Sequence, residues 1–276
     1  MSFLLWLSTL PIISYVLELI KHILIRSLRT GNLPNHIAFI MDGNRRYAKQ
    51  HKLPVSQGHN MGSESLASIL ELCYKLNIQA VSIYAFSIEN FNRSKSEVNY
   101  LMDLIQKKLS QISEHGDLVD KFGIKIIFSG NKSFLPKDVY DTFKETEERT
   151  KNNGNVILNI CFPYTARDDI TRSIKKIVSD VKQDKLEVEE IREETVSNNL
   201  DTKSLPPLDF MMRTSGVRRL SDYLLWEITD NDAELELLDI YWPELNQLIL
   251  TWSIFKWSFR KTSLNDFFKQ DKAKIE

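Results

Sequence analysis

The sequence has few cysteines, glycines and prolines, and it carries almost no net charge. Two cysteines, nine glycines and eight prolines in 276 residues exclude a disulfide scaffold, a collagen-like chain and a low-complexity chain. Thirty-six basic residues against 37 acidic ones leave a net charge of −1, so no general basic field favours a nucleic-acid ligand. With 42% hydrophobic residues, a chain of this length can bury a full core. The composition indicates a globular protein whose anion-binding sites, if any, are built locally.

Motifs that mark several large enzyme classes are also missing. The sequence contains no GxxxxGK[ST], GxGxxG, HExxH or GxSxG pattern, which disfavours kinases, dehydrogenases, zinc proteases and serine hydrolases. Cys73 and Cys161 lie far apart and have no CxxC or His-rich companion, which argues against a structural zinc site.

The first 32 residues differ in composition from the rest of the chain. Pro11 interrupts the apolar run over 3–17 and Glu18 follows it, so the run falls short of the roughly 20 apolar residues of a membrane span. No basic stretch precedes the run, unlike in a secretory signal. Further along, an apolar stripe recurs at helical spacing, formed by Ile13, Val16, Leu17, Ile20 and Leu24. This stripe predicts an amphipathic helix on a membrane surface, and packing on the following domain is the alternative.

After residue 33, short β-rich runs alternate with longer amphipathic runs. The expected strands are 36–41, 78–85, 124–129, 156–161, 208–212 and 235–241. The expected helices lie near 62–76, 96–115, 135–152, 165–182, 187–199, 221–229 and 243–262. Strands separated by helices form parallel sheets that are covered on both faces. The pattern predicts one α/β domain at 33–262, with a six-stranded, mainly parallel sheet flanked by helices, and a polar tail at 263–276.

Three clusters of polar residues follow predicted strands, where ligands bind in open α/β sheets. They occupy residues 42–47, 87–93 and 213–221. Gly43 permits a tight turn after which helix amides can hold phosphate oxygens, and the arginines of the clusters add charged donors. Asp42 would repel a phosphate unless Mg²⁺ bridges the two. Each cluster alone is compatible with an ordinary loop, but together they predict a site for two polyanionic groups.

Two further residues near these clusters have expected roles. His59 is a candidate phosphate donor, although a lone histidine is more often structural. Ser221 is expected to cap the helix that follows the third cluster.

Three stretches of the sequence resemble the signature blocks of cis-prenyltransferases, the family of undecaprenyl and dehydrodolichyl diphosphate synthases. They are HIAFIMDGNRRYAK at 36–49, YAFSIENFNR at 84–93 and RTSGVRRLSD at 213–222. The first block is most similar to that of the eukaryotic dehydrodolichyl diphosphate synthase subunits, particularly the fungal ones. The resemblance spans about 33–262, and it implies a six-stranded parallel sheet, Mg²⁺ dependence and a hydrophobic tunnel for the growing chain.

The implied reaction condenses several isopentenyl diphosphates onto farnesyl diphosphate or a similar allylic starter. The product is a long-chain polyprenyl (dehydrodolichyl) diphosphate for dolichol synthesis and protein glycosylation. Asp42 matches the family aspartate that engages the metal, and Ser87 and Asn90 match the position proposed to help remove the proton. The implied contacts of the starter are Gly43, Asn44, Arg45, Arg46, Tyr47 and His59. The implied contacts of isopentenyl diphosphate are Arg213, Arg219, Leu220 and Ser221. Ile88, Glu89, Phe91 and Arg93 are expected to shape the region around Asn90.

Three features depart from the family pattern. Val55 stands where many members carry an arginine three residues before the Gly-His pair. Bacterial members carry a second acidic metal ligand before the Trp-Pro pair, and the segment between Trp226 and Trp242 is longer here than in those enzymes. Counting back from Trp242 selects Glu234, and counting forward from Trp226 selects Asp232. Asp232 and Glu236 remain open alternatives for that ligand. The C-terminal tail lacks the Arg-x-Gly motif that single-chain members extend across their dimer to the substrate.

The missing motif predicts a second polypeptide that supplies it. The resemblance identifies this partner as a Nogo-B-receptor-like subunit, and the segments 96–115 and 243–262 are candidates for an apolar interface. The expected location is the cytosolic face of the endoplasmic reticulum membrane, with peripheral attachment, or a lipid droplet. The alternative function is a non-catalytic scaffold or partner subunit of a prenyltransferase complex. Such subunits lose the aspartate and arginine blocks and keep Arg-x-Gly, which is the reverse of this sequence.

Overall fold

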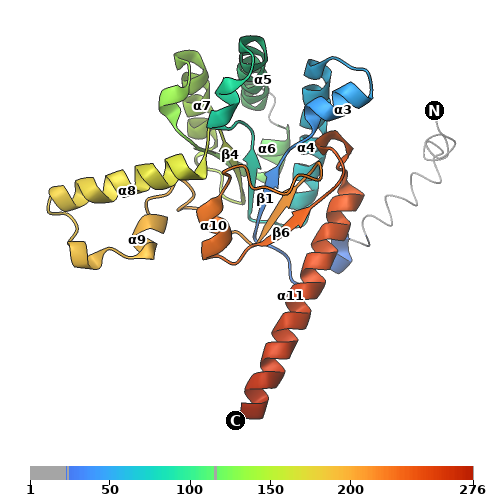
Figure 1. Cartoon of the computed structure of the whole chain (residues 1–276). Coiled ribbons are helices and arrows are strands. Elements are labelled where there is room, and N and C mark those ends of the chain that lie inside the picture. The colour runs from blue at the N-terminus through green and yellow to red at the C-terminus, as the bar shows by residue number, and fades with distance from the viewer. Residues whose placement is uncertain (1–22, 24, 115–116, 276) are drawn as a thin grey trace. The chain divides into compact units, whose positions relative to one another are not determined.

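The structure, a computed structural model, describes residues 23, 25–114 and 117–275 (Figure 1). The chain forms two compact units, one of residues 35–245 and one that joins residues 1–34 to 246–276. The predicted amphipathic stripe from Ile13 to Leu24 lies outside the described residues. The boundaries predicted for the three segments, 1–32, 33–262 and 263–276, stay predictions.

A six-stranded parallel sheet forms the centre of the larger unit (Figure 1). Its strands are β1 (His36–Ile40), β2 (Ala80–Tyr84), β3 (Ile124–Ser129), β4 (Val156–Cys161), β5 (Phe210–Arg213) and β6 (Glu234–Leu237). They lie in the order β3-β4-β2-β1-β5-β6, and every neighbouring pair is parallel. The predicted fold class is confirmed, and the first five strands begin and end within two residues of their predicted bounds.

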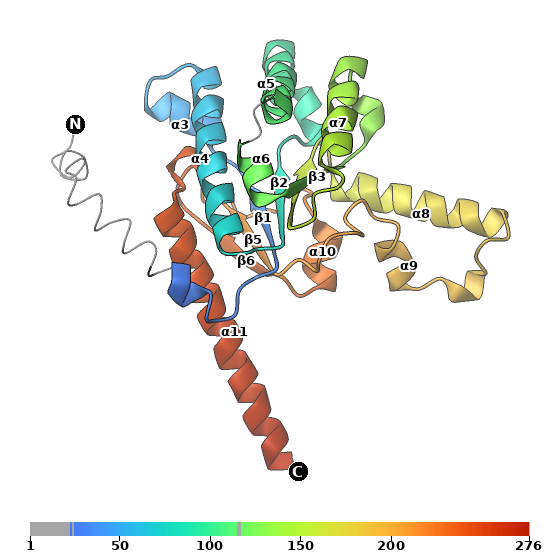
Figure 2. The same cartoon turned by 180° about the vertical axis from the view of Figure 1, so that it is seen from behind.

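Helices cover both faces of this sheet. They are α3 (Asn44–Gln50), α4 (Val55–Lys75), α5 (Lys95–Glu114), α6 (Asp117–Phe122), α7 (Lys137–Thr150), α8 (Ala166–Lys182), α9 (Glu193–Ser197) and α10 (Leu225–Asp230). Four short 3-10 helices join them: η1 (Ile88–Asn92), η2 (Lys132–Phe134), η3 (Val188–Glu190) and η4 (Trp242–Glu244). Figure 1 and Figure 2 show α4 and α6 on one face of the sheet and α10 on the opposite face.

Several helices differ from those predicted. The helix predicted near 62–76 begins earlier, at Val55. Gly58 and Gly62 lie within its first turns, where the lack of a side chain lets α3 approach closely. A Cβ atom at Gly58 would lie 2.4 Å from the carbonyl oxygen of Asn44. The helix predicted at 187–199 consists of η3 and α9 only, and α3 and α6 were not predicted.

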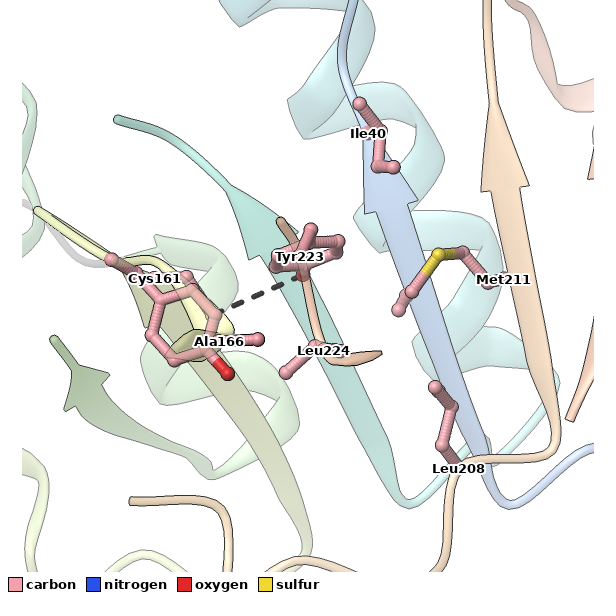
Figure 3. Packing of buried hydrophobic residues seen from close by; sticks show 9 residues of the cluster. Ile40, Cys161, Ala166, Leu208, Met211, Tyr223 and Leu224 are labelled. Atoms are coloured by element: carbon pink, nitrogen blue, oxygen red, sulfur yellow. Dashed lines mark hydrogen bonds between the residues drawn. The ribbon is translucent and has the colours of Figure 1, made fainter. Parts of the chain in front are cut away.

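Side chains of β1 are buried on both faces of the sheet. Successive strand residues point to opposite faces, so Ile37 and Phe39 pack on one side and Ala38 and Ile40 on the other. Figure 3 shows the second side, where Ile40 belongs to a buried cluster with residues of β4, β5 and the chain before α10. This double burial explains why the strand sequences are continuous apolar runs.

His36, the first residue of β1, is a buried and neutral side chain. Its ring nitrogens lie 2.9 Å from the carbonyl oxygen of Pro206 and 2.8 Å from the hydroxyl oxygen of Ser82. Burial lowers the pKa of His36 to about 4, although the hydrogen bond with Pro206 opposes this shift.

We expect the free energy of unfolding to fall as the pH drops from 6.5 to 4. The unfolded chain binds a proton at His36 in this range, whereas the folded chain does not. The difference in pKa corresponds to about 3 kcal/mol at pH 4, and the full contribution is present above pH 6.5. Denaturant titrations at pH 7 and pH 4 measure it. His36→Gln removes the titrating group and should flatten the pH dependence; an equal loss of stability in this variant would contradict the assignment.

The smaller unit consists mainly of α11 (Gln247–Ile275), which runs further than the helix predicted at 243–262. The side-chain amide of Asn32 donates a hydrogen bond of 3.2 Å to the Thr262 hydroxyl of this helix. One face of α11 carries exposed apolar side chains at helical spacing, namely Leu248, Trp252, Phe255 and Phe259. None of the helices within the described part of the chain has the length and apolar content needed to cross a membrane.

Candidate active site

Asp42 follows β1 at the edge of the sheet where the strands end, beside Arg213 at the end of β5. Arg213 Nη2 donates to Asp42 Oδ2 at 2.7 Å, and Arg46 Nη2 lies 3.2 Å from Asp42 Oδ1. Burial alone would raise the pKa of Asp42. The hydrogen bond and charge of Arg213, followed by those of Arg46, outweigh burial and lower this pKa below its ordinary value. Asp42 is therefore an ionised carboxylate between two guanidinium groups.

Gly43 makes the turn between Asp42 and α3 possible. Its φ is 108°, in the left-handed region that favours glycine. A Cβ atom there would lie 2.8 Å from the ring of Tyr241, so a larger residue has no space. The turn leads directly into α3, which carries Arg45 and Arg46.

The turn after β5 gathers two arginines around one serine hydroxyl. Arg213 Nη1 donates to Ser221 Oγ at 2.8 Å and also to the carbonyl oxygen of Arg219. Arg219 Nε donates to the same Ser221 Oγ at 3.3 Å. The prediction that Ser221 caps the following helix is wrong, because α10 begins at Leu225, and the Ser221 hydroxyl bonds these arginines instead.

Arg46 connects the first and third polar clusters. Its guanidinium donates to the carbonyl oxygen of Ser215 at 3.3 Å and to the Ser215 hydroxyl. The Thr214 hydroxyl donates to the carbonyl oxygen of Asp42 at 2.7 Å. Ser215 and Thr214 were not among the predicted site residues, although they lie within the third signature block. The two clusters therefore form one continuous site.

Glu97, which was not predicted, lies close to a second group of basic side chains. Its carboxylate oxygens lie 2.9 Å from Arg93, 3.6 Å from Arg45 and 3.9 Å from His59. Burial lowers the pKa of His59, although the charge of Glu97 opposes this effect, so the ring is neutral near pH 7. The sequence signal for Glu97 is its spacing of four residues from Arg93, although Arg93 has an extended backbone and precedes α5, which begins at Lys95.

The second polar cluster begins with a compact turn. The backbone amide of Ser87 donates to Asn90 Oδ1 at 3.1 Å, and the amide of Glu89 donates to Ser87 Oγ at 3.2 Å. This reciprocal capping fixes the orientation of both side chains at the start of η1.

Most of the predicted site residues line one polar cavity of about 810 Å³. They are Asp42, Gly43, Asn44, Arg45, Arg46, His59, Ser87, Glu89, Asn90, Arg93, Arg213, Arg219 and Ser221. Lys49, Tyr84 and Val217 also line it and were not predicted.

Four predicted contact residues lie outside this cavity. Tyr47 stacks on His51, with ring centroids 4.1 Å apart. Phe91 packs against the rings of Phe86 and Phe134. Leu220 packs against the buried cluster of Figure 3, and Ile88 begins η1 without lining the cavity. Adjacent residues of a turn point in different directions, which the signature blocks alone do not reveal.

Glu234, the predicted second metal ligand, is not brought to Asp42 within this chain. It begins β6 and lies opposite Phe210, whereas Leu237 lies opposite Arg213. Three residues of strand, about 10 Å, therefore separate Glu234 from the edge that carries Asp42. Neither Glu234 nor the alternatives Asp232 and Glu236 line the polar cavity.

An apolar cavity of about 470 Å³ adjoins the polar one. Met41, Asn44, His59, Ala85 and Leu101 line both cavities. One face of α4 lines the apolar cavity through His59, Gly62, Ser63, Leu66, Ala67, Leu70 and Tyr74. The 15 steps of the helix from His59 to Tyr74 correspond to about 22 Å along its axis. A charged pocket that opens into a long apolar one suits a ligand with a polyanionic head and a hydrocarbon tail.

Comparisons with known proteins agree with this geometry. Residues 40–265 match a family model described as a putative undecaprenyl diphosphate synthase. A dehydrodolichyl diphosphate synthase complex subunit of Schizosaccharomyces pombe is 43% identical, with 87% of this chain and 91% of the relative covered. The corresponding subunit of Homo sapiens is 39% identical, with 83% and 67% covered.

Solved structures give the same result. The crystal structure of lavandulyl diphosphate synthase from Lavandula x intermedia, in complex with dimethylallyl diphosphate, has a TM-score of 0.77 and 29% identity. The match covers 82% of this chain and 95% of that one. The chain belongs to the cis-prenyltransferase family of undecaprenyl diphosphate synthase-like enzymes. The aspartate and arginine blocks are both present and line one cavity, which supports a catalytic role over that of a scaffold.

Proposed function

We propose that the protein is a Mg²⁺-dependent synthase of long-chain polyprenyl diphosphate of the dehydrodolichyl type. It extends farnesyl diphosphate, or a similar allylic starter, with isopentenyl diphosphate units. The observation that carries this proposal is that the two cavities share lining residues, because the polar cavity can hold the charged groups of both substrates and the apolar one can hold the growing hydrocarbon.

The arginines of the polar cavity suit the charge change in this reaction. Carbon–carbon bond formation releases the diphosphate of the allylic substrate and one proton from the added unit. Charge-assisted donors such as Arg46, Arg213 and Arg219 stabilise the developing charge on diphosphate oxygens.

Asn90 is a neutral amide and a poor base, so its role is to position the reacting groups, with diphosphate as the acceptor of the proton.

Asp42 is the residue that would hold Mg²⁺. Within the described part of the chain, no group of three or more His, Cys, Asp or Glu side chains is arranged to bind a metal. A single carboxylate fits a Mg²⁺ ion whose remaining ligands are substrate phosphate oxygens and water, as is usual for this ion. When bound, Mg²⁺ neutralises charge on the diphosphate.

The test is conversion of radiolabelled isopentenyl diphosphate into chloroform-soluble product, with farnesyl and geranylgeranyl diphosphate as alternative starters. The second starter is included because a Pyrococcus horikoshii relative, 40% identical, is described as specific for geranylgeranyl diphosphate. The assay is repeated with a partner subunit whose own active site is disabled. If this chain is only a scaffold, no labelled product should form.

The two diphosphate sites should be separable by arginine substitutions. Arg219→Ala should raise the KM for isopentenyl diphosphate by about tenfold or more, because a charge-assisted hydrogen bond is lost. Arg45→Ala, in the group around Glu97, should instead raise the KM for the starter. Arg46 contacts Asp42 and Ser215, so its loss should affect both substrates. Steady-state kinetics with each substrate varied in turn measures these effects; equal changes for both substrates in the Arg219 and Arg45 variants would contradict the division.

The protein is further proposed to act as one subunit of a complex at a membrane. Relatives from yeasts and human are described as complex subunits, which supports a partner subunit. We propose that the partner is a Nogo-B-receptor-like chain that provides the Arg-x-Gly motif. We also propose peripheral attachment at the cytosolic face of the endoplasmic reticulum or at lipid droplets.

Deleting residues 1–30 should release much of the protein from membranes. The apolar stripe in this segment is the predicted attachment, and peripheral binding should also yield to high pH or mild detergent. Sedimentation of membranes from cells that express the full and shortened chains measures the bound fraction. Unchanged sedimentation of the shortened chain would assign the attachment to the partner subunit or to another surface.

A further inference from the structure

The chain from the end of the third polar cluster to the start of α10 has an unusual backbone. Ser221, Asp222 and Leu224 have φ values of 53°, 59° and 44°, although none of them is glycine. Side chains disfavour this left-handed region, so three such residues within four positions store strain. A backbone of this kind persists only where surrounding contacts hold it.

One of these contacts comes from Tyr84, the last residue of β2. Its hydroxyl lies 3.1 Å from the carbonyl oxygen of Ser221 and 3.1 Å from that of Tyr164, and it donates to this pair. The ring of Tyr84 also stacks on the ring of Tyr223, with centroids 4.3 Å apart and planes 13° apart. Tyr84 therefore holds the strained turn through both its ring and its hydroxyl.

The start of α8 holds the same turn from another direction. The backbone amide of Ala166 donates to the carbonyl oxygen of Asp222 at 2.8 Å. The Asp222 carboxylate accepts from the backbone amide of Arg167 at 3.1 Å and from its guanidinium at 2.8 Å. Two anchors on different elements thus fix the position of Ser221.

The position of Ser221 matters because its hydroxyl organises both arginines of the third cluster. Ser221 Oγ accepts hydrogen bonds from Arg213 and Arg219, and all three residues line the polar cavity. A displacement of the turn would therefore carry Ser221 Oγ away from the hydrogen-bond donors of both guanidinium groups.

We propose that Tyr84 is a positioning residue for the isopentenyl diphosphate site: its hydroxyl holds the strained turn at 221–224 and thereby sets the geometry of Arg213, Arg219 and Ser221. The assignment of this substrate to the third cluster rests on the proposed function. Burial raises the pKa of Tyr84, so the hydroxyl remains a donor at neutral pH.

Tyr84→Phe tests the proposal, because it removes the hydroxyl and keeps the ring stacked on Tyr223. Tyr223→Phe is the matched control, since its hydroxyl faces Cys161, 3.9 Å away, and holds no carbonyl of the turn (Figure 3). Both variants are made in the full-length chain and assayed together with the partner subunit.

Tyr84→Phe should raise the KM for isopentenyl diphosphate by about five- to tenfold, the effect of one hydrogen bond. The KM for the starter should change little, and Tyr223→Phe should leave both constants unchanged. In a double-mutant cycle with Ser221→Ala, the two effects should be less than additive, because both act on the same turn. An equal rise of both KM values, or full additivity, would overturn the proposal.

Amide hydrogen exchange supplies a readout that does not depend on prenyl transfer. The amide of Ala166 donates to the carbonyl oxygen of Asp222, and the amide of Tyr223, within the turn, donates to that of Leu220, so both should exchange faster in Tyr84→Phe. Unchanged exchange at both amides would show that the Tyr84 hydroxyl does not hold the turn at 221–224. If the wild-type complex makes no polyprenyl product but exchange increases in Tyr84→Phe, then Tyr84 does hold the turn and it is the proposed function that fails.

Discussion

Replacing Asp42 by alanine is expected to lower chain-extending activity by at least about a hundredfold, which corresponds to roughly 3 kcal/mol. Asp42 is the carboxylate that would hold a diphosphate-bound Mg²⁺, and it also balances the charges of Arg213 and Arg46. Turnover at saturating Mg²⁺ and saturating substrates measures the loss. Activity near that of the wild type would contradict the assignment.

Alanine at this position also has a structural effect that must be separated from catalysis. Arg213 is only 2% exposed, so removal of its carboxylate partner leaves a buried charge without its counter-ion. Asp42→Asn keeps an oxygen that can accept from Arg213 and removes the negative charge. We expect this variant to melt close to the wild type and still to lose most of its activity. Asp209→Asn is a suitable control, because Asp209 accepts backbone amides at the other end of the same strand pair.

The chain purified alone is expected to be about a hundredfold less active than its complex, the usual effect of removing one preorganised donor from a charged transition state. This expectation rests on the proposed partner subunit, which would supply the Arg-x-Gly motif to the site. Adding the partner subunit should restore synthesis, and mutating Arg-x-Gly in the partner should abolish this gain. Full specific activity from a verified homomer would refute the dependence on a partner and leave the prenyltransferase assignment standing.

The exposed apolar face of α11 gives this prediction a structural test. Trp252 and Phe259 are 60% and 66% exposed, which is a large exposure for apolar side chains of this size. Substituting both by glutamate should prevent co-purification of the partner. Val188→Glu is the matched control, because Val188 is equally exposed at 60% on η3 and lies in the other unit. Loss of the partner in the control as well would show a general effect of the added charge.

The six strands of the parallel sheet and the clustering of polar residues at their ends could be predicted because both follow from simple patterns. Buried parallel strands are continuous apolar runs, and the carboxyl ends of such strands share one edge of the sheet. This is why Asp42, Asn90 and Arg213 were expected together and line one cavity. The register between β1 and β5 places Ile40 opposite Arg213, which brings Asp42, two residues after Ile40, close to Arg213.

Other features depend on contacts that a linear pattern does not contain. Glu97 and Tyr84 act through side chains that cross from one element to another, and each lies inside an ordinary helix or strand pattern. The two glycines in α4 concealed its first two turns, although they serve the close packing of α3. Ser221 has the residue type of a helix cap but a left-handed backbone, which the sequence of a non-glycine residue does not signal.

The position of β1 between β2 and β5 also has a consequence for synthesis of the chain. Asp42 and Arg213 are 171 residues apart in sequence, so at ribosomal rates roughly 10 to 30 s pass between the appearance of one and of the other. During this time β1 can pair with β2, but its other edge has no partner, and unpaired apolar edges favour aggregation. Pairing across so long a separation is also slow. The contact between Asp42 and Arg213 therefore forms late during synthesis, and until then a strand that is buried throughout in the folded protein is an open edge.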